Sequence, residues 1–307
     1  MKAASLLRAA RRWIDNSAPE AQPHSGERRI DWPRVVPFLA LHAGCLGALA
    51  TGASATALAV AAALFALRMF AVTAFYHRYF SHRAFRTSRA AQLAFAILGA
   101  MAVQRGPLWW ASHHRHHHAH SDGEGDPHSA RRHGLLWSHV GWFLSREAFA
   151  TLDKRVGDLA RFPELRWLDR YDVAVPALLG VALYGAGACL ERAHPALATS
   201  GMQLFVWGFC ISTVALYHAT FTINSLAHRF GSRRYATRDD SRNNWWLALL
   251  TFGEGWHNNH HHFPVSARQG FYWWEIDLSY YGLRALAALG VIWDLRQVPA
   301  RAREARP

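Results

Sequence analysis

The sequence predicts an all-α integral membrane protein in which four transmembrane helices support a cytoplasmic helical cap. Three observations lead to this fold class. The chain has 307 residues, of which 51% are hydrophobic, and its apolar residues gather in four long stretches. Many of its 20 histidines gather in three clusters at membrane-proximal positions. The formal net charge of +13 suggests contact with an anionic membrane surface.

Composition also argues against several classes of protein. The basic residues flank long apolar segments and form neither a stripe nor a known binding motif, so we expect no nucleic-acid partner. The three cysteines, Cys45, Cys189 and Cys210, all lie in apolar runs and make no CxxC pair. They read as small core residues, not as a disulfide framework or as thiolate metal ligands.

Four apolar stretches come close to the roughly 20 residues that a helix needs to cross a bilayer. A fifth run, Ala90–Val103, is shorter, and we expect it to lie in the membrane interface. Arg68 falls near the far end of the second stretch, and we expect its side chain to extend to the interface. The four predicted spans cover residues 35–52, 54–73, 173–190 and 203–223.

The spans belong to one predicted membrane domain, residues 34–299, between two basic tails. The N-terminal tail covers residues 1–33, and the C-terminal tail covers residues 300–307. The first residues contain no long apolar region that would indicate a signal peptide. Leu6, Leu7 and Trp13 among arginines suggest an interfacial amphipathic helix, with a disordered basic tail as the alternative.

The distribution of arginine predicts the orientation of the spans. Arginines are frequent in the N-terminal tail and directly after the second span, whereas residues 51–53, after the first span, carry no charge. The positive-inside rule therefore places both termini and the long central loop in the cytoplasm. The arginines concerned are Arg8, Arg11, Arg12, Arg28, Arg29 and Arg34, followed by Arg78, Arg83, Arg86 and Arg89.

Three histidine clusters dominate the polar part of the sequence. The stretch HRYFSH contains His77 and His82 directly after the second span. The stretches HHRHHH and GEGWHNNHHHFP both contain the spacing H-x-x-H-H, which places three histidines on one face of a helix. Buried imidazoles are costly without a partner and are well suited to metal binding. The histidines with this spacing are His114, His117 and His118, then His257, His260 and His261.

The predicted topology brings the three clusters to the same side of the membrane. If Ala90–Val103 lies in the interface, the first two clusters share the cytoplasmic side, and two further crossings return the chain there for the third. Asn224 and His228 are one helical turn apart at the cytoplasmic end of the fourth span, as a site pair or as a polar helix end. Nine histidines suggest two metal ions, since one ion uses three or four ligands. Imidazole suits zinc, copper, iron and nickel, so the residue types leave the metal open.

These motifs, in this order, resemble those of the membrane fatty-acid desaturase family, in the branch of the stearoyl-CoA desaturases and their bacterial relatives. The resemblance runs from about Arg68 to Pro299 and includes HHRHHHAHSDGEGDPHSARR, SHVGWF, FTINSLAH and YWWEIDLSYYGLRALAALGVIWDL. It implies an enzyme that uses O2 and a histidine-held, non-haem di-iron centre in its cap. The implied reaction introduces a cis double bond, at position Δ9, into a saturated acyl chain held in a bent, dry tunnel.

The resemblance also assigns residues and partners. Asn224 would act on the metal through a bound water. No HPGG-like haem motif or ferredoxin-like cysteine set is found, so the electron donor is expected to be a separate protein, a ferredoxin or a cytochrome b5-like protein with its reductase. The implied iron ligands are His77, His82, His114, His117, His118, His228, His257, His260 and His261.

The remaining residues near the motifs receive supporting roles. Asp126 and Glu254 could accept hydrogen bonds from metal-bound imidazoles or could cap loops. Four aromatic residues could line the tunnel or anchor the chain at the membrane interface, namely Phe75, Tyr76, Trp109 and Trp110. The histidines outside the ligand spacing are expected to lie around the ligands or on the surface, namely His113, His116, His120, His128, His133, His139 and His262.

The chain departs from the acyl-CoA branch where that branch places charged residues. Ser112 and His113 precede the second cluster, and Arg146 and Glu147 follow SHVGWF, so only Arg146 keeps the expected charge. The substrate is therefore expected to be acyl-CoA or else a phospholipid-linked acyl chain. Headgroup contacts are predicted at Arg131, Arg132 and Arg146.

Two other functions fit parts of the pattern. A membrane hydroxylase of acyl or alkyl chains uses similar histidine clusters and would yield an alcohol instead of an alkene. A non-enzymatic zinc-binding or zinc-transporting membrane protein would need a polar path through the spans. Apart from Arg68, His42 and His218, the predicted spans are nearly all apolar, which argues against such a path.

Overall fold

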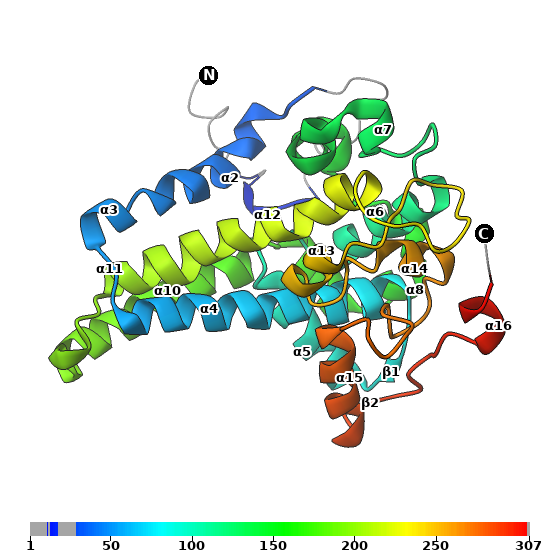
Figure 1. The fold of residues 1–307 in the computed structure, drawn as a ribbon. Helices are drawn as coiled ribbons and strands as arrows, with labels where there is room; N and C mark the ends of the chain where they lie inside the picture. The colour runs from blue at the N-terminus through cyan, green and yellow to red at the C-terminus, as the bar shows by residue number, and fades with distance from the viewer. Residues whose placement is uncertain (1–10, 12, 18–28, 306–307) are drawn as a thin grey trace.

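The computed structural model describes residues 11, 13–17 and 29–305, so the predicted interfacial helix at Leu6 and Leu7 lies outside the described residues. The regular elements of the described chain are helices and one antiparallel pair of two-residue strands, β1 (Arg86–Thr87) and β2 (Ile292–Trp293). Figure 1 shows long helices side by side on one side of the molecule and a cap of short helices at their ends. The mostly helical architecture agrees with the predicted fold class.

Four helical segments are long and apolar enough to cross a membrane, as the sequence predicts. The first, Arg34–Thr51, contains α2 (Trp32–Cys45) and α3 (Ala48–Thr51). The second, Ala55–Ser81, joins α4 (Ala55–Phe70) to the π-helix η2 (Ala71–Ser81). The third is α10 (Ala174–Ala193). The fourth, Gly201–His228, contains α11 (Gly201–Gln203), the π-helix η8 (Leu204–Ile211), α12 (Ser212–Ser225) and η9 (Leu226–His228).

The cap is built from the segments between and after these spans. Before the third span it contains α5 (Arg89–Ala100), α6 (Pro107–His120), α7 (Ala130–His133), η3 (Trp137–Gly141), η4 (Trp142–Leu144), η5 (Arg146–Ala148), η6 (Asp153–Arg155), α8 (Gly157–Ala160) and α9 (Pro163–Arg170). A short turn, η7 (Pro195–Leu197), joins the third and fourth spans. After the fourth span follow α13 (Trp245–Leu250), α14 (His257–His262), α15 (Leu278–Ala288) and α16 (Ala300–Arg303).

The fifth apolar run forms the short helix α5, which packs beside η2. Ser88 caps its first turn by accepting a hydrogen bond from the backbone N–H of Ala91. Gly99 allows the close approach, because a Cβ there would lie 2.1 Å from a ring atom of Tyr76. Phe95 stacks on Phe75 of η2 with ring centroids 3.9 Å apart. These contacts fix the segment that carries the first histidine cluster.

Arg68 does not extend to the interface, and this expectation was wrong. Its side chain is fully buried among the spans. The guanidinium donates to the hydroxyls of Ser212 and Thr213, at 2.5 and 2.7 Å, and to three backbone carbonyls. A buried guanidinium needs such partners for its five N–H groups. The fourth span supplies them from residues that are distant in the sequence.

Helix α6, which carries the second histidine cluster, begins against a buried carboxylate. Pro107 occupies its first turn, where the missing N–H costs nothing. Asp169 of α9 accepts hydrogen bonds from the backbone N–H of Trp109, at 2.7 Å, and from the hydroxyl of Thr151, at 2.7 Å. Burial raises the pKa of Asp169 to about 6. The carboxylate thus sets where α6 starts and which face its histidines present.

Candidate metal centre

Nine histidines converge into two adjacent groups. Within each group the ring nitrogens lie within 4.8 Å of one another, as the ligands of one metal ion do. The first, called the five-histidine group, contains His77, His82, His114, His118 and His260. The second, called the four-histidine group, contains His117, His228, His257 and His261.

The imidazole tips face each other at short range. The Nε2 atom of His260 lies 3.0 Å from Nε2 of His77 and 2.9 Å from Nε2 of His118. In the four-histidine group, Nε2 of His228 lies 2.9 Å from Nε2 of His257. His261 Nε2 is buried and has no hydrogen-bond partner. A buried acceptor without a partner is costly unless a metal ion satisfies it.

Four helical elements bring these side chains together. The π-helix η2 ends the second span and carries His77, and His82 follows directly as its C-cap residue. The other members come from α6, η9 and α14. A π-helical turn inside an otherwise α-helical span is frequent at functional sites. Here it lies beside the first histidine cluster.

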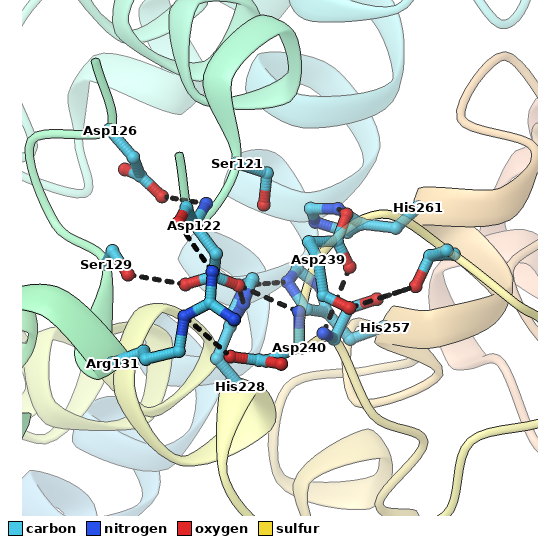
Figure 2. Close-up of polar contacts among 12 residues, drawn as sticks. Ser121, Asp122, Asp126, Ser129, Arg131, His228, Asp239, Asp240, His257 and His261 are labelled. Atoms are coloured by element: carbon cyan, nitrogen blue, oxygen red, sulfur yellow. Dashed lines mark hydrogen bonds and ion pairs between the residues drawn. The ribbon is translucent and has the colours of Figure 1, made fainter. Parts of the chain in front are cut away.

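Carboxylates hold the outward nitrogens of four of these histidines. His228 Nδ1 lies 2.8 Å from Asp122, and His261 Nδ1 lies 2.8 Å from Asp239 (Figure 2). His117 Nδ1 lies 3.2 Å from Asp126, and His77 Nδ1 contacts Glu254. A carboxylate at Nδ1 fixes the tautomer that leaves the Nε2 lone pair for a metal.

Burial and the imidazole partners set the charge state of this site. Burial alone would raise the pKa of Asp122 and of Asp239. The hydrogen bond and charge attraction from His228 or His261, together with further hydrogen bonds from Ser129 and Asp240 or from Ser241, outweigh burial and hold the pKa of each carboxyl group well below its usual range. Burial lowers the pKa of His118 and of other members of the five-histidine group well below the usual value. A lowered pKa favours neutral imidazoles at His82, His114, His118 and His260, whereas the neighbouring Asp126 raises the pKa of His117. Imidazoles oriented by anionic carboxylates are a donor set that fits iron and other first-row metals.

A cavity of about 250 Å³ lies beside the metal centre. It is lined mainly by apolar and aromatic side chains from α2, α6, α10 and α12, and Asn224 and His114 face it. Of the four residues predicted to line the tunnel, Trp109 and Trp110 line this cavity. Phe75 and Tyr76 are instead buried in the hydrophobic core between the helices. The cavity therefore reaches the five-histidine group at His114.

Most of the remaining histidines make hydrogen bonds to backbone carbonyls. His113 bonds to Ala150 O, and His262 bonds to Ala302 O and stacks on Tyr235. His116, His120 and His133 likewise bond to backbone carbonyls. His128 stacks on His117 and lies with Asp126 in a third, smaller group that could hold a metal ion. Burial lowers the pKa of His128 to about 3.

The three arginines predicted to bind a headgroup do not line this cavity. Arg131 forms an ion pair with Asp240 and donates to Asp122 O, beside the four-histidine group (Figure 2). Arg132 and Arg146 are exposed. Arg34 and Arg105 line the cavity instead. Sequence reasoning did not single these two out for this role, because only the fold brings them to the cavity.

Sequence reasoning also missed two carboxylates of the site. Asp122 and Asp239 contact ligand-candidate histidines that are 106 and 22 residues away. Asp122 lies in the same SDGEGD loop as Asp126, which was considered, and Asp239 lies in a short acidic pair within a basic segment. Acidic residues are scarce in this chain, so that local pair is the signal that could have indicated Asp239.

The fold and the site together define a helical membrane protein with a buried histidine centre at one end of its spans. Residues 53–295 match the model of the fatty acid desaturase family, and the chain belongs to that family. The chain is therefore an oxidoreductase that desaturates fatty-acyl chains.

The chain resembles relatives that act on different acyl carriers. It is 36% identical over 275 residues to the sn-1 stearoyl-lipid 9-desaturase of Anabaena variabilis, across 89% of this chain and 96% of that protein. It is 38% identical over 226 residues to the palmitoyl-monogalactosyldiacylglycerol delta-7 desaturase of Arabidopsis thaliana, across 73% and 57%. It is 37% identical over 216 residues to the acyl-CoA 5-desaturase AL21 of Anemone leveillei, across 69% and 63%.

Proposed function

We propose that this desaturase uses two iron ions and O2 to place a cis double bond at Δ9 of a saturated acyl chain. The observation that carries the proposal is the convergence of nine buried or half-buried histidines into two groups beside an apolar cavity. The five-histidine group would hold one iron. The four-histidine group would hold the other, with Asn224 acting through a water.

Each group of residues has a distinct task in this proposal. Once bound, the iron and O2 supply the oxidising power that removes one hydrogen from each of two adjacent methylenes. The overall reaction consumes O2, two electrons and two protons and releases two waters. The carboxylates fix the imidazole tautomers. Trp109, Trp110 and the other apolar lining residues exclude water and hold the chain, so that one C–C bond is presented to the centre.

The orientation and the partners are part of the same proposal. The arginines that follow the second span support a cytoplasmic location for the cap, with both termini on that side. Electrons would come from a separate ferredoxin or cytochrome b5-like protein with its reductase. Both lipid-linked and CoA-linked carriers occur among the named relatives, so the relatives support either carrier for this chain.

Two measurements test the function and the metal. Lipids from a host that expresses the protein should gain a cis double bond at position 9, located by mass spectrometry. A new alcohol would indicate a hydroxylase, and an alkene at another position would contradict Δ9. Purified protein should contain close to two irons per chain and little zinc. One zinc and no iron, from iron-replete cells, would contradict the di-iron centre.

A further inference from the structure

Three histidines outside the metal centre form a second hydrogen-bonded cluster, called here the histidine clamp. It consists of His42 of α2, His139 of η3 and His218 of α12. His218 Nε2 lies 3.2 Å from His42 Nε2, and His218 Nδ1 lies 3.1 Å from His139 Nε2. The clamp thus joins three elements that are otherwise far apart in the sequence.

Donor and acceptor chemistry fixes the direction of these bonds. The carbonyl of Phe38 can only accept, so His42 Nδ1 donates to it over 2.8 Å and neutral His42 presents Nε2 as an acceptor. His218 Nε2 then donates to His42, and His218 Nδ1 accepts from His139 Nε2. His139 Nδ1 in turn lies 2.9 Å from the Ser225 hydroxyl. The bonds use both nitrogens of each ring, and the Ser225 hydroxyl at the end of the series also lies 3.0 Å from the carbonyl of Phe221.

The clamp lies just outside the wall of the acyl cavity. Directly behind it, Phe38 stacks on Tyr217 with ring centroids 5.8 Å apart, and Phe143 packs on Phe221 at 4.8 Å. These four aromatic residues all line the cavity. One layer of rings therefore separates the cavity from the clamp. His218 is exposed on the outer surface of the fourth span, and His42 and His139 are half-buried beside it.

Polar side chains at a lipid-facing position of a span are expensive, so such residues are commonly functional. Between helices in lipid the hydrophobic effect is weak, and directional hydrogen bonds contribute to association. Bonds of this kind can hold a seam closed and can be broken and remade. If the hydrogen bonds between two helices open, the acyl chain of a membrane lipid can pass between the helices into the cavity without passing through water.

Helix α2 is suited to move along this seam because it is anchored mainly at its two ends. At one end, Gly44 and Gly47 approach η8 so closely that a Cβ on either would lie 2.8 Å from a side-chain atom of η8. At the other end, Ile30 pairs with Ser145 in a β-bridge. Pro37 lies between the anchors and lacks the N–H of a helical hydrogen bond.

The surroundings of α2 agree with a mobile helix. Of the most apolar 18 residues, 11% are buried inside the protein in the first span, compared with 17% in the third and 56% in the fourth. Figure 1 shows α2 at the edge of the group of long helices, alongside α12. Between its anchors, the aromatic contacts and the histidine clamp are what hold α2 against α12.

We propose that the seam between α2 and α12 is a lateral gate, closed by the histidine clamp, through which the acyl chain of a membrane glycerolipid enters the cavity. This inference rests on the proposed desaturase function and specifies its substrate as an acyl chain that is already esterified in the bilayer. The headgroup stays at the membrane surface while the chain moves sideways between the helices.

A reversible cross-link across the gate tests the proposal. The variant combines His42→Cys with His218→Cys in a chain whose three native cysteines are replaced by alanine, and a bifunctional methanethiosulfonate joins the two thiols. Membrane vesicles of the expressing host supply both the glycerolipids and the electron donor. We expect cross-linking to lower lipid desaturation at least about ten-fold with iron content unchanged, and dithiothreitol to restore it.

A matched control places the same cross-link at an anchor of α2, where no movement is expected. Ile30→Cys with Ser145→Cys joins two residues that are already paired, and the cross-linked control should keep its rate within about two-fold. Equal rates for the cross-linked and released clamp variant, or equal inhibition of the control, would overturn the gate. Absence of any double bond before cross-linking would instead contradict the desaturase function itself.

A second measurement does not depend on activity. His218→Phe keeps an aromatic ring in the seam and removes both imidazole bonds. Leu41 lines the cavity, and a bilayer-soluble maleimide should label Leu41→Cys several-fold faster in the His218→Phe background. An unchanged labelling rate, with the protein folded and loaded with iron, would show that the clamp does not control access.

Discussion

The two halves of the metal centre are built from the same residue type but are held in different ways. The five-histidine group is positioned by helical backbone, and its described carboxylate contact is Glu254 on His77. In the four-histidine group, three members contact carboxylates, namely Asp122, Asp126 and Asp239. These carboxylates lie in the loops after α6 and after η9. The difference shows that one half depends on helix geometry and the other on the acidic loops.

The largest effect is expected from the histidines themselves. His118→Ala in the five-histidine group and His261→Ala in the four-histidine group should each abolish desaturation, because a lost ligand opens or empties a metal position. Iron per chain should fall from about two to about one. Product formation measures the loss of desaturation, and elemental analysis of the purified protein measures the loss of iron.

His262→Ala and His113→Ala are the matched controls. Their imidazoles bond to backbone carbonyls, so substantial activity should remain. If His262→Ala were as inactive as His261→Ala while iron was retained, the ligand assignment in α14 would be wrong.

The next largest effect is expected from Asp239→Asn, which should affect the four-histidine group and not the five-histidine group. Asp239→Asn removes the anionic partner of His261 and should lower activity about 10- to 100-fold, the usual range for the partners of metal ligands. The loss should be accompanied by weaker binding of one iron and not of both. Iron release to a chelator, followed over time, measures this.

The neighbouring residue supplies the control for this prediction. Asp240 forms its ion pair with the exposed Arg131, and Asp240→Asn should change activity by less than about three-fold. Equal loss of both irons in Asp239→Asn would contradict the difference between the halves.

Asp169, a buried carboxyl group away from the histidines, should make the stability of the protein depend on pH. Burial raises the pKa of Asp169 to about 6, from an ordinary value of 3.8. The folded state therefore holds this proton more tightly than the unfolded state, so the contribution of Asp169 to stability is present below about pH 4 and is lost as pH rises through 6. The loss amounts to about 3 kcal/mol.

Asp169→Asn should remove that dependence, and above pH 6 the variant should be more stable than the wild type. The measurement is thermal unfolding in detergent between pH 4 and 7.5, with wild type and variant compared at each pH. A difference that does not change with pH would show that Asp169 is ionised throughout.

The smallest effect is expected at the arginines predicted to bind a headgroup. Arg146 is exposed and does not line the cavity, so Arg146→Ala should change the desaturation of glycerolipids by less than about two-fold. An acyl-CoA substrate gripped by this residue predicts a raised KM for acyl-CoA and a dependence on salt instead. Steady-state kinetics with each carrier distinguishes the two.

The sequence by itself determined the spans and the histidine faces, because both follow from local periodicity. Apolar runs of sufficient length predicted the four long helices, and the spacing H-x-x-H-H predicted which histidines share a helix face. The parity of the crossings predicted that all three clusters meet on one side, and the structure brings them together. These inferences needed only the rise and twist of a helix and the thickness of a bilayer.

Only the tertiary structure decided how the histidines divide between the two groups. In each H-x-x-H-H cluster the pair four residues apart goes to one group and the remaining histidine to the other, and the assignment is reversed between α6 and α14. The rotation of each helix about its axis decides this, and packing against other helices sets that rotation.

The tertiary structure also decided the fate of polar residues inside the spans. Arg68 is buried because Ser212 and Thr213 of the fourth span accept hydrogen bonds from its guanidinium. His42 and His218 are hydrogen-bonded although 176 residues separate them in the sequence. A polar side chain in a bilayer takes whatever partner the neighbouring helix offers, since water is absent. The sequence of one span does not contain that partner, so long-range packing decided what these residues do.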